Sequence, residues 1–158
     1  MMNYVERILQ PGESVLHAAR LHWFIYLKGL ALLLLALVCI MFALAVGSSE
    51  RPSIEIPLWL GAGVLALLGV VSAAAAMIEQ ATTELVLTER RVIYKTGLLK
   101  RHTMEMNRSK VETVSVDQSV LGRLLNYGTV IVRGTGGSLE PIRKIDDPLT
   151  FRSYITAG

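Results

Sequence analysis

Basic side chains are concentrated in one short stretch of the chain, between positions 90 and 110. The stretch contains Arg90, Arg91, Lys95, Lys100, Arg101, Arg108 and Lys110. Cationic side chains attract anionic phosphates, and each one close to an anionic lipid surface contributes about 1 kcal/mol of binding. The first five of these residues are therefore candidates for contact with lipid headgroups. The alternative is that the charges only set the orientation of a neighbouring membrane segment.

Other kinds of chemistry find little support in the sequence. From residue 82 onward the net charge is about +4 and aromatic side chains are few, which argues against a nucleic-acid partner. His17, His22 and His102 have no Cys, Asp or Glu at zinc-site spacing, so no metal is expected. The glycine-rich run 134–137 precedes a strand pattern and lacks the Lys-Ser/Thr pair of a phosphate-binding loop. With no arrangement typical of a catalytic site, the sequence predicts a non-enzymatic protein without a cofactor.

Two uncharged apolar stretches, residues 29–46 and 56–78, precede most of the basic residues. As helices, their 18 and 23 residues would measure roughly 27 and 35 Å, against a bilayer hydrocarbon core of about 30 Å. The sequence therefore predicts a transmembrane hairpin. Neither stretch contains an ionisable residue, which argues against transport through a single hairpin and leaves an oligomeric pore as an alternative.

The basic residues around these stretches predict their orientation. Arg7, Arg20 and Lys28 precede the first stretch, the basic cluster follows the second, and only Arg51 lies between them. By the positive-inside rule we expect a multi-pass membrane protein with both termini cytoplasmic. The expected parts are a cytosolic juxtamembrane segment (1–23), transmembrane helix 1 (24–46), an external loop (47–55), transmembrane helix 2 (56–78) and a cytosolic domain (80–158).

Small residues recur at helical spacing in both apolar stretches. They are Gly29, Ala36 and Ala43 in the first, and Ala62, Ala66, Gly69, Ala73 and Ala76 in the second. Helices in lipid associate by close backbone approach over such residues. The stripes predict helix packing, either within the hairpin or between two copies of the chain.

After residue 82 the pattern changes to short strands separated by turn residues. Strands are expected over 84–87, 92–96, 98–106, 111–116, 130–132 and 139–145, with a helical turn over 119–125. Asp147 is expected to cap a last helix that has Pro148 in its first turn. The simplest assembly is a curved antiparallel sheet closed by this helix.

The order of these motifs resembles a known family. Residues 83–97 look like the opening hairpin of the bacterial pleckstrin-homology-like (PH-like) domain of the second type. Further similar features are a Val-x-x-Val strand (111–114), a Gly-x-x-x-x-Tyr-Gly connection (122–128), a glycine-rich hairpin (134–137) and a Pro-x-x-Phe helix start (148–151). The resemblance implies a PH-like barrel anchored to the membrane, and it supplies no catalytic residues.

Together these features predict an α+β membrane protein: a two-helix transmembrane hairpin, then a PH-like curved antiparallel β-sheet or barrel with a C-terminal helix. The leading hypothesis is a membrane-anchored interaction module, acting as a scaffold or accessory subunit of a membrane protein assembly. Its partners would be membrane lipids and a second protein or further copies of the chain, meeting exposed strand edges or small-residue helix faces. The alternatives are a module that senses anionic lipids at the inner leaflet and an oligomeric pore.

Overall fold

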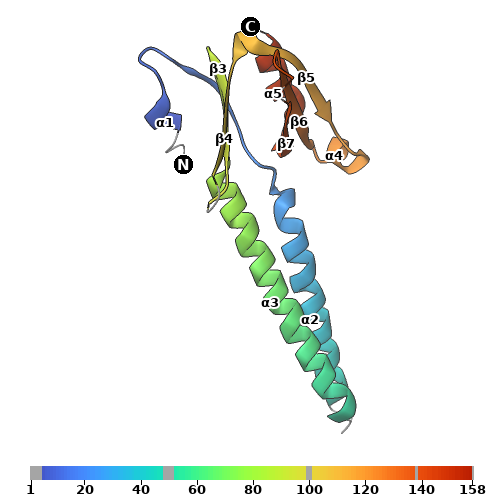
Figure 1. The fold of residues 1–158 in the computed structure, drawn as a ribbon. Helices are drawn as coiled ribbons and strands as arrows, with labels where there is room; N and C mark the ends of the chain where they lie inside the picture. The colour runs from blue at the N-terminus through green and yellow to red at the C-terminus, as the bar shows by residue number, and fades with distance from the viewer. Residues whose placement is uncertain (1–4, 48–51, 99–100, 138, 158) are drawn as a thin grey trace. The chain divides into compact units, whose positions relative to one another are not determined.

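The computed structural model describes residues 5–47, 52–98, 101–137 and 139–157. The chain divides into two compact units, which are treated separately below (Figure 1). The helical hairpin is Trp23–Ile78, and the sheet domain combines Met1–His22 with Glu79–Gly158. The hairpin is thus an insertion in the chain of the sheet domain.

The helical hairpin consists of η1 (Trp23–Tyr26), α2 (Leu27–Gly47) and most of α3 (Pro52–Thr82). By length and composition Trp23–Val46 and Ile54–Thr82 could each cross a membrane, and only 17% of each apolar window is buried. Large side chains such as Val38, Leu60 and Leu67 face outward, which is the reverse of a helix in a soluble core. Residues 48–51 of the expected external loop lie outside the described residues.

The described part of the sheet domain contains seven strands in two antiparallel sheets. The first sheet has the order β1 (Val15–Ala19), β2 (Glu84–Thr88), β3 (Arg91–Thr96), β4 (His102–Asn107). The second has the order β5 (Val111–Asp117), β6 (Tyr127–Gly134), β7 (Leu139–Asp146). Shorter elements are α1 (Val5–Ile8), η2 (Arg108–Lys110), α4 (Val120–Leu124) and α5 (Pro148–Thr156).

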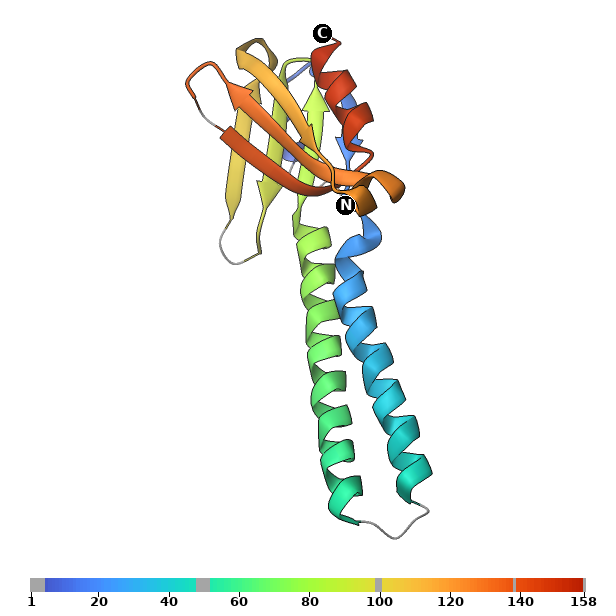
Figure 2. The same ribbon diagram turned by 90° about the vertical axis from the view of Figure 1, so that its right-hand side faces the viewer.

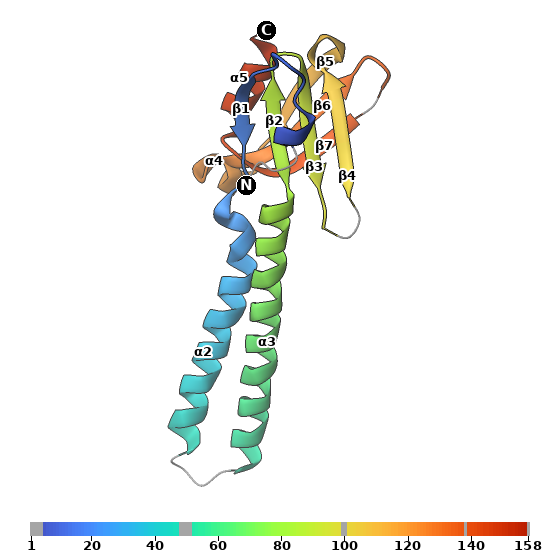
Figure 3. The ribbon, with the colours of Figure 1, turned by 90° about the vertical axis from the view of Figure 1, so that its left-hand side faces the viewer.

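The central strands of the first sheet are covered on both faces. Leu85, Val86 and Leu87 are all buried, although successive side chains of a strand point to opposite faces. Val86 packs with Ile93 of β3 and with Val5 of α1, which lies over this sheet (Figure 3). The N-terminal segment therefore covers the face that would otherwise meet water.

The second core lies on the other face of these strands and is closed by α5. Phe151 of α5 is fully buried, as are Val130, Val132 and Ile142 of the second sheet. Helix α5 contacts β5, β6 and β1, so it touches strands of both sheets (Figure 2). This position explains why the last helix begins with a buried proline and carries Phe151 four residues after Asp147.

The structure confirms an α+β chain with two long apolar helices, antiparallel sheets and a C-terminal helix. It differs from the expected details in several places, among them the following three. Strand β1 was not predicted, and it pairs with β2 across about 65 residues of intervening sequence. The third strand begins at His102, later than position 98. Asp147 precedes α5 as expected, but its φ of 44° is left-handed and its side chain makes no capping hydrogen bond.

Candidate interaction site

A buried ion pair ties the N-terminal segment to the β2–β3 hairpin. Arg91 Nε and Nη2 donate to the two carboxylate oxygens of Glu13 over 3.0 and 2.9 Å. The Glu13 side chain is 1% exposed and also accepts a 2.7 Å hydrogen bond from Thr88 Oγ1. Arg91 makes two further contacts, to Glu105 Oε2 and to the carbonyl of Ile8, both at 2.8 Å. Bidentate geometry of this kind is the strongest form of such a pair.

The ion pair changes the acidity of both partners. The hydrogen bonds from Arg91 lower the pKa of Glu13 from 4.5 to about 2, against the opposing effect of burial. Glu13 in turn raises the pKa of Arg91. Both groups therefore carry their charges throughout the neutral and mildly acidic range.

Acid should weaken the sheet domain through Glu13. Its pKa is lower folded than unfolded, so its contribution to stability is complete above the unfolded value and is lost as pH falls toward the folded one. We expect the free energy of unfolding of the full chain in detergent to fall by up to about 3 kcal/mol as the pH is lowered from about 5 to about 2. Glu13→Gln should remove most of this slope, and an unchanged slope would contradict the assignment.

The predicted basic residues do not lie together. Arg91 is held by Glu13 and Glu105, and the half-buried Lys95 lies 3.6 Å from Glu84. Arg90 and Arg101 are exposed at opposite ends of β3, about 20 Å apart at the usual strand rise. Lys100 lies outside the described residues. The geometry therefore gives Arg91 a structural position and divides the others between two ends of the sheet.

The small residues of the two apolar stretches face the opposite helix of the hairpin. Gly29, Ala36, Ala43, Ala62, Gly69 and Ala76 are buried, and Ala66 and Ala73 are half-buried. A Cβ at Gly29 would lie 3.0 Å from the backbone nitrogen of Ala73, and one at Gly69 would lie 2.8 Å from Leu33 side-chain atoms. By contrast, a Cβ at Gly61 or Gly63 would meet open space.

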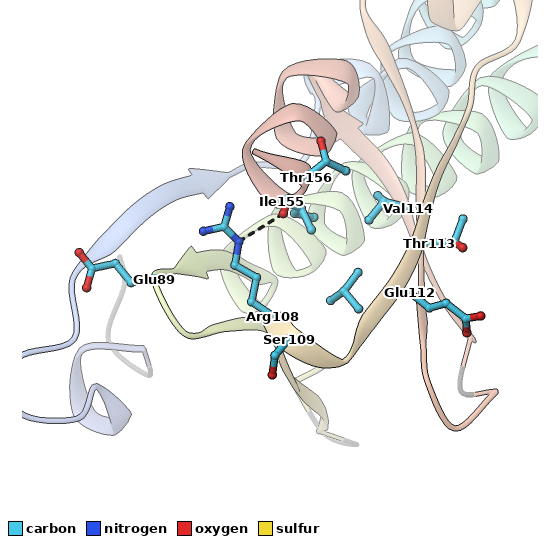
Figure 4. A pocket seen from close by; sticks show the side chains of 9 residues that line it. Glu89, Arg108, Ser109, Glu112, Thr113, Val114, Ile155 and Thr156 are labelled. Atoms are coloured by element: carbon cyan, nitrogen blue, oxygen red, sulfur yellow. Dashed lines mark hydrogen bonds between the residues drawn. The ribbon is translucent and has the colours of Figure 1, made fainter. Parts of the chain in front are cut away.

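A groove of about 470 Å³ runs between β5 and the C-terminal end of α5 (Figure 4). Its floor includes Val114 and Ile155, and Glu89 and Glu112 also line it. Arg108 extends toward the end of α5, where its Nη2 and Nε donate to the carbonyls of Tyr154 and Ile155 over 2.6 and 3.2 Å. These bonds satisfy carbonyls that a helix end leaves unpaired and hold the groove's two walls together.

β5 is an edge strand, because β6 is its neighbour on one side only. Helix α5 contacts both β5 and β1, and His102 at the other edge of the first sheet lies 2.9 Å from Glu140 of β7. Val114 and Val116 of β5 are half-buried, whereas Thr113 and Ser115 are exposed. The groove therefore borders a strand whose outer side chains are small and uncharged at these two positions.

Two of the histidines, His17 and His22, pack against tyrosine rings. His17 stacks on Tyr154 with ring centroids 4.7 Å apart, and His22 lies on Tyr127 at 5.2 Å. In the described ranges no three His, Cys, Asp or Glu side chains are grouped as a metal site would need.

Two of the residues that organise this region, Glu13 and Arg108, were not singled out from the sequence. Glu13 follows Pro11 and Gly12 in a segment that was noted only as preceding the membrane stretch. Its neighbours in sequence give no signal that marks it, because its cationic partner lies 78 residues away. Arg108 was counted only as one member of the basic cluster.

Comparison with known proteins agrees with this architecture. A family model described as a bacterial PH domain matches residues 16–158. No curated protein and no solved structure matches the chain. The match begins within β1 and extends through both apolar helices to the end of α5, so it covers most of the chain.

PH-like domains in general mediate lipid or protein interactions and are non-catalytic. The earlier resemblance is confirmed, and the chain belongs to the bacterial PH domain family.

Proposed function

We propose that this protein is a non-enzymatic, membrane-anchored scaffold or accessory subunit whose PH-like domain binds a protein partner along β5. The observation that carries the proposal is the groove between the β5 edge and α5. An extended segment of a partner can add to such an edge through main-chain hydrogen bonds, while its side chains enter the adjoining groove. Edge strands are otherwise commonly protected by charged residues or proline.

The groove also favours a particular partner chemistry. Two carboxylates, Glu89 and Glu112, and one guanidinium, Arg108, line the groove, so the charge of its described lining is negative on balance. The Glu89 carboxylate accepts a 2.6 Å hydrogen bond from the Ser14 hydroxyl. An extended partner segment with Lys or Arg beside apolar residues would complement this lining.

Membrane anchoring is proposed from the hairpin. Its apolar windows are mostly unburied, and its large side chains face outward while its small ones face the neighbouring helix. That arrangement suits a solvent of lipid chains. The sheet domain would then be held at the cytoplasmic face, with the bacterial inner membrane as the location.

The lipid-sensing alternative receives less support. A lipid-binding face needs several cations on one surface, and here Arg91 is engaged by two carboxylates while Arg90 and Arg101 are separated by the length of β3. The pore alternative has no specific observation in its favour among the described residues.

A pair of matched threonine substitutions tests the β5 edge. Thr113 and Thr103 are exposed positions on the edge strands β5 and β4. Full-length Thr113→Lys should lose a partner that co-purifies from gently solubilised membranes, because a lysine blocks strand addition and stays hydrated. Thr103→Lys should retain the partner, and both variants should unfold within about 0.5 kcal/mol of the wild type.

The possible results separate the alternatives. Equal retention by both variants would exclude β5 as the binding edge. Absence of any protein partner from the wild type, with the chain still in the membrane fraction, would contradict the scaffold proposal. Recovery of the wild-type chain in the aqueous fraction without detergent would contradict the membrane anchoring.

A further inference from the structure

Helix α4 presents apolar side chains to its surroundings. Val120, Leu121 and Leu124 are 85%, 56% and 79% exposed. Residues at i, i+1 and i+4 lie on one side of a helix, so these three form a single apolar tip. Single exposed apolar residues are ordinary on protein surfaces, whereas a contiguous group indicates a binding surface.

The tip is held firmly by the domain. Gly122 seats α4 against the start of β6, where a Cβ on this residue would lie 2.6 Å from the Tyr127 carbonyl oxygen. Ser119 caps the helix by accepting a 3.0 Å hydrogen bond from the Gly122 N–H. The side-chain amide of Gln118 donates to the Tyr127 carbonyl over 3.1 Å. Exposure of the leucines is therefore a property of a fixed element.

Contacts within the sheet domain place α4 where the chain leaves for the apolar helices. Tyr127 lies on His22, with ring centroids 5.2 Å apart, and His22 is followed directly by Trp23, where the first apolar window begins. Leu124 is three residues before Tyr127, which limits their Cα separation to about 11 Å.

A second contact supports the same placement from the other helix. Lys144 of β7 lies 3.2 Å from Glu79, which is close to the end of α3. The backbone carbonyl of Lys144 also accepts a 2.8 Å hydrogen bond from the His22 N–H. The two connections to the apolar helices, at His22 and Glu79, therefore both contact β7, and His22 also contacts β6, the strand against which α4 packs.

We infer that α4 is a second membrane contact: Val120, Leu121 and Leu124 enter the interfacial layer of the bilayer that holds the hairpin. This inference rests on the proposed membrane anchoring. If the helix that starts at Trp23 is inserted in a bilayer, the bilayer surface lies close to His22 and therefore close to α4. Nothing comparable holds a protein partner near α4. Arg123, exposed on the same helix, would lie at the level of the anionic headgroups. The contact would fix the domain against the membrane and leave the β5 groove open to partners.

A depth-sensitive label tests the contact in the full chain. In a Cys39→Ser background, Leu124→Cys would carry an environment-sensitive fluorophore, with Ser109→Cys as the control. Ser109 is exposed and follows Arg108, whose backbone N–H donates to the carbonyl of Arg90. Arg90 lies in the turn between β2 and β3, at the end of β2 that is remote from α3. Vesicles of phosphatidylethanolamine and phosphatidylglycerol would contain a lipid with a spin label on its acyl chain. We expect several-fold stronger quenching at position 124 than at 109.

The native tryptophans separate failure of this inference from failure of the anchoring. Trp23 and Trp59 are exposed on the hairpin and should be quenched by the same lipid if the helices are inserted. Quenched tryptophans with equal, weak quenching at 124 and 109 would overturn the α4 contact alone. Unquenched tryptophans would overturn the anchoring and the inference together. A blue-shifted but unquenched label at 124, dependent on protein density, would instead identify a second copy of the chain as the occupant and overturn the lipid contact.

Discussion

Glu13→Ala is expected to lower the free energy of unfolding of the sheet domain by about 3–5 kcal/mol. The substitution leaves the Arg91 guanidinium buried without its bidentate partner and removes one of the two acceptors of the Thr88 hydroxyl. Loss of the pair also releases the segment that covers Val86. Chemical denaturation of the full chain in mild detergent, followed by a probe in the sheet domain, would measure the change.

Glu105→Ala supplies the matched control, because Glu105 also contacts Arg91 but is itself exposed. A solvated ion pair contributes about 0–1 kcal/mol, so this variant should be nearly neutral. The double variant Glu13→Leu, Arg91→Met should be more stable than Glu13→Ala, since no guanidinium that has lost its bidentate carboxylate remains buried. Equal losses for Glu13→Ala and Glu105→Ala would contradict the role assigned to the buried pair.

Gly29→Val should destabilise the helical hairpin by about 1–3 kcal/mol, the usual cost of overpacking. The nearest obstacle is the backbone nitrogen of Ala73, 3.0 Å from an added Cβ, and backbone cannot rotate aside as a side chain can. Thermal unfolding in mild detergent, followed by helical circular dichroism, would report the change.

Gly63→Val is the control for this second prediction, because it places the same side chain in open space on α3. It should unfold at or slightly above the wild-type temperature, since valine is no worse than glycine in a helix. If the stripe instead packed between copies of the chain, Gly29→Val would change the oligomeric state and leave hairpin stability unaltered. Identical behaviour of the two variants would exclude both kinds of packing at Gly29.

Local patterns predicted those elements whose partners are close in sequence. The hairpin of β2 and β3 follows from two short runs of apolar and β-branched residues on either side of a short polar turn, and its register pairs Val86 with Ile93. The helix start at Pro148 and the apolar helices follow in the same way from residue type alone. Each of these features depends on neighbours within a few residues or on composition.

Features that depend on distant partners could not be predicted in this way. The sequence of β1, Val15–Ala19, contains two alanines and a histidine, and it becomes a strand because β2 pairs with it from beyond the hairpin. Charge alone made Arg91 one of five candidates for lipid contact, and its acidic partner, 78 residues away, could not be identified from the sequence. The exposure of Leu124 depends on the close contact between Gly122 and the Tyr127 carbonyl, which the sequence pattern does not predict.

The pairing of β1 with β2 has a consequence for how the chain is made. During synthesis from the N-terminus, β1 emerges first and its neighbour follows only after both apolar helices have been translated. The first sheet therefore cannot close until the hairpin has left the ribosome. If residues 23–78 were replaced with a short turn, β1 and β2 would be neighbours in sequence, and they would pair at the faster rate of an ordinary β-hairpin. The inserted helical hairpin would thus delay completion of the first sheet until late in synthesis.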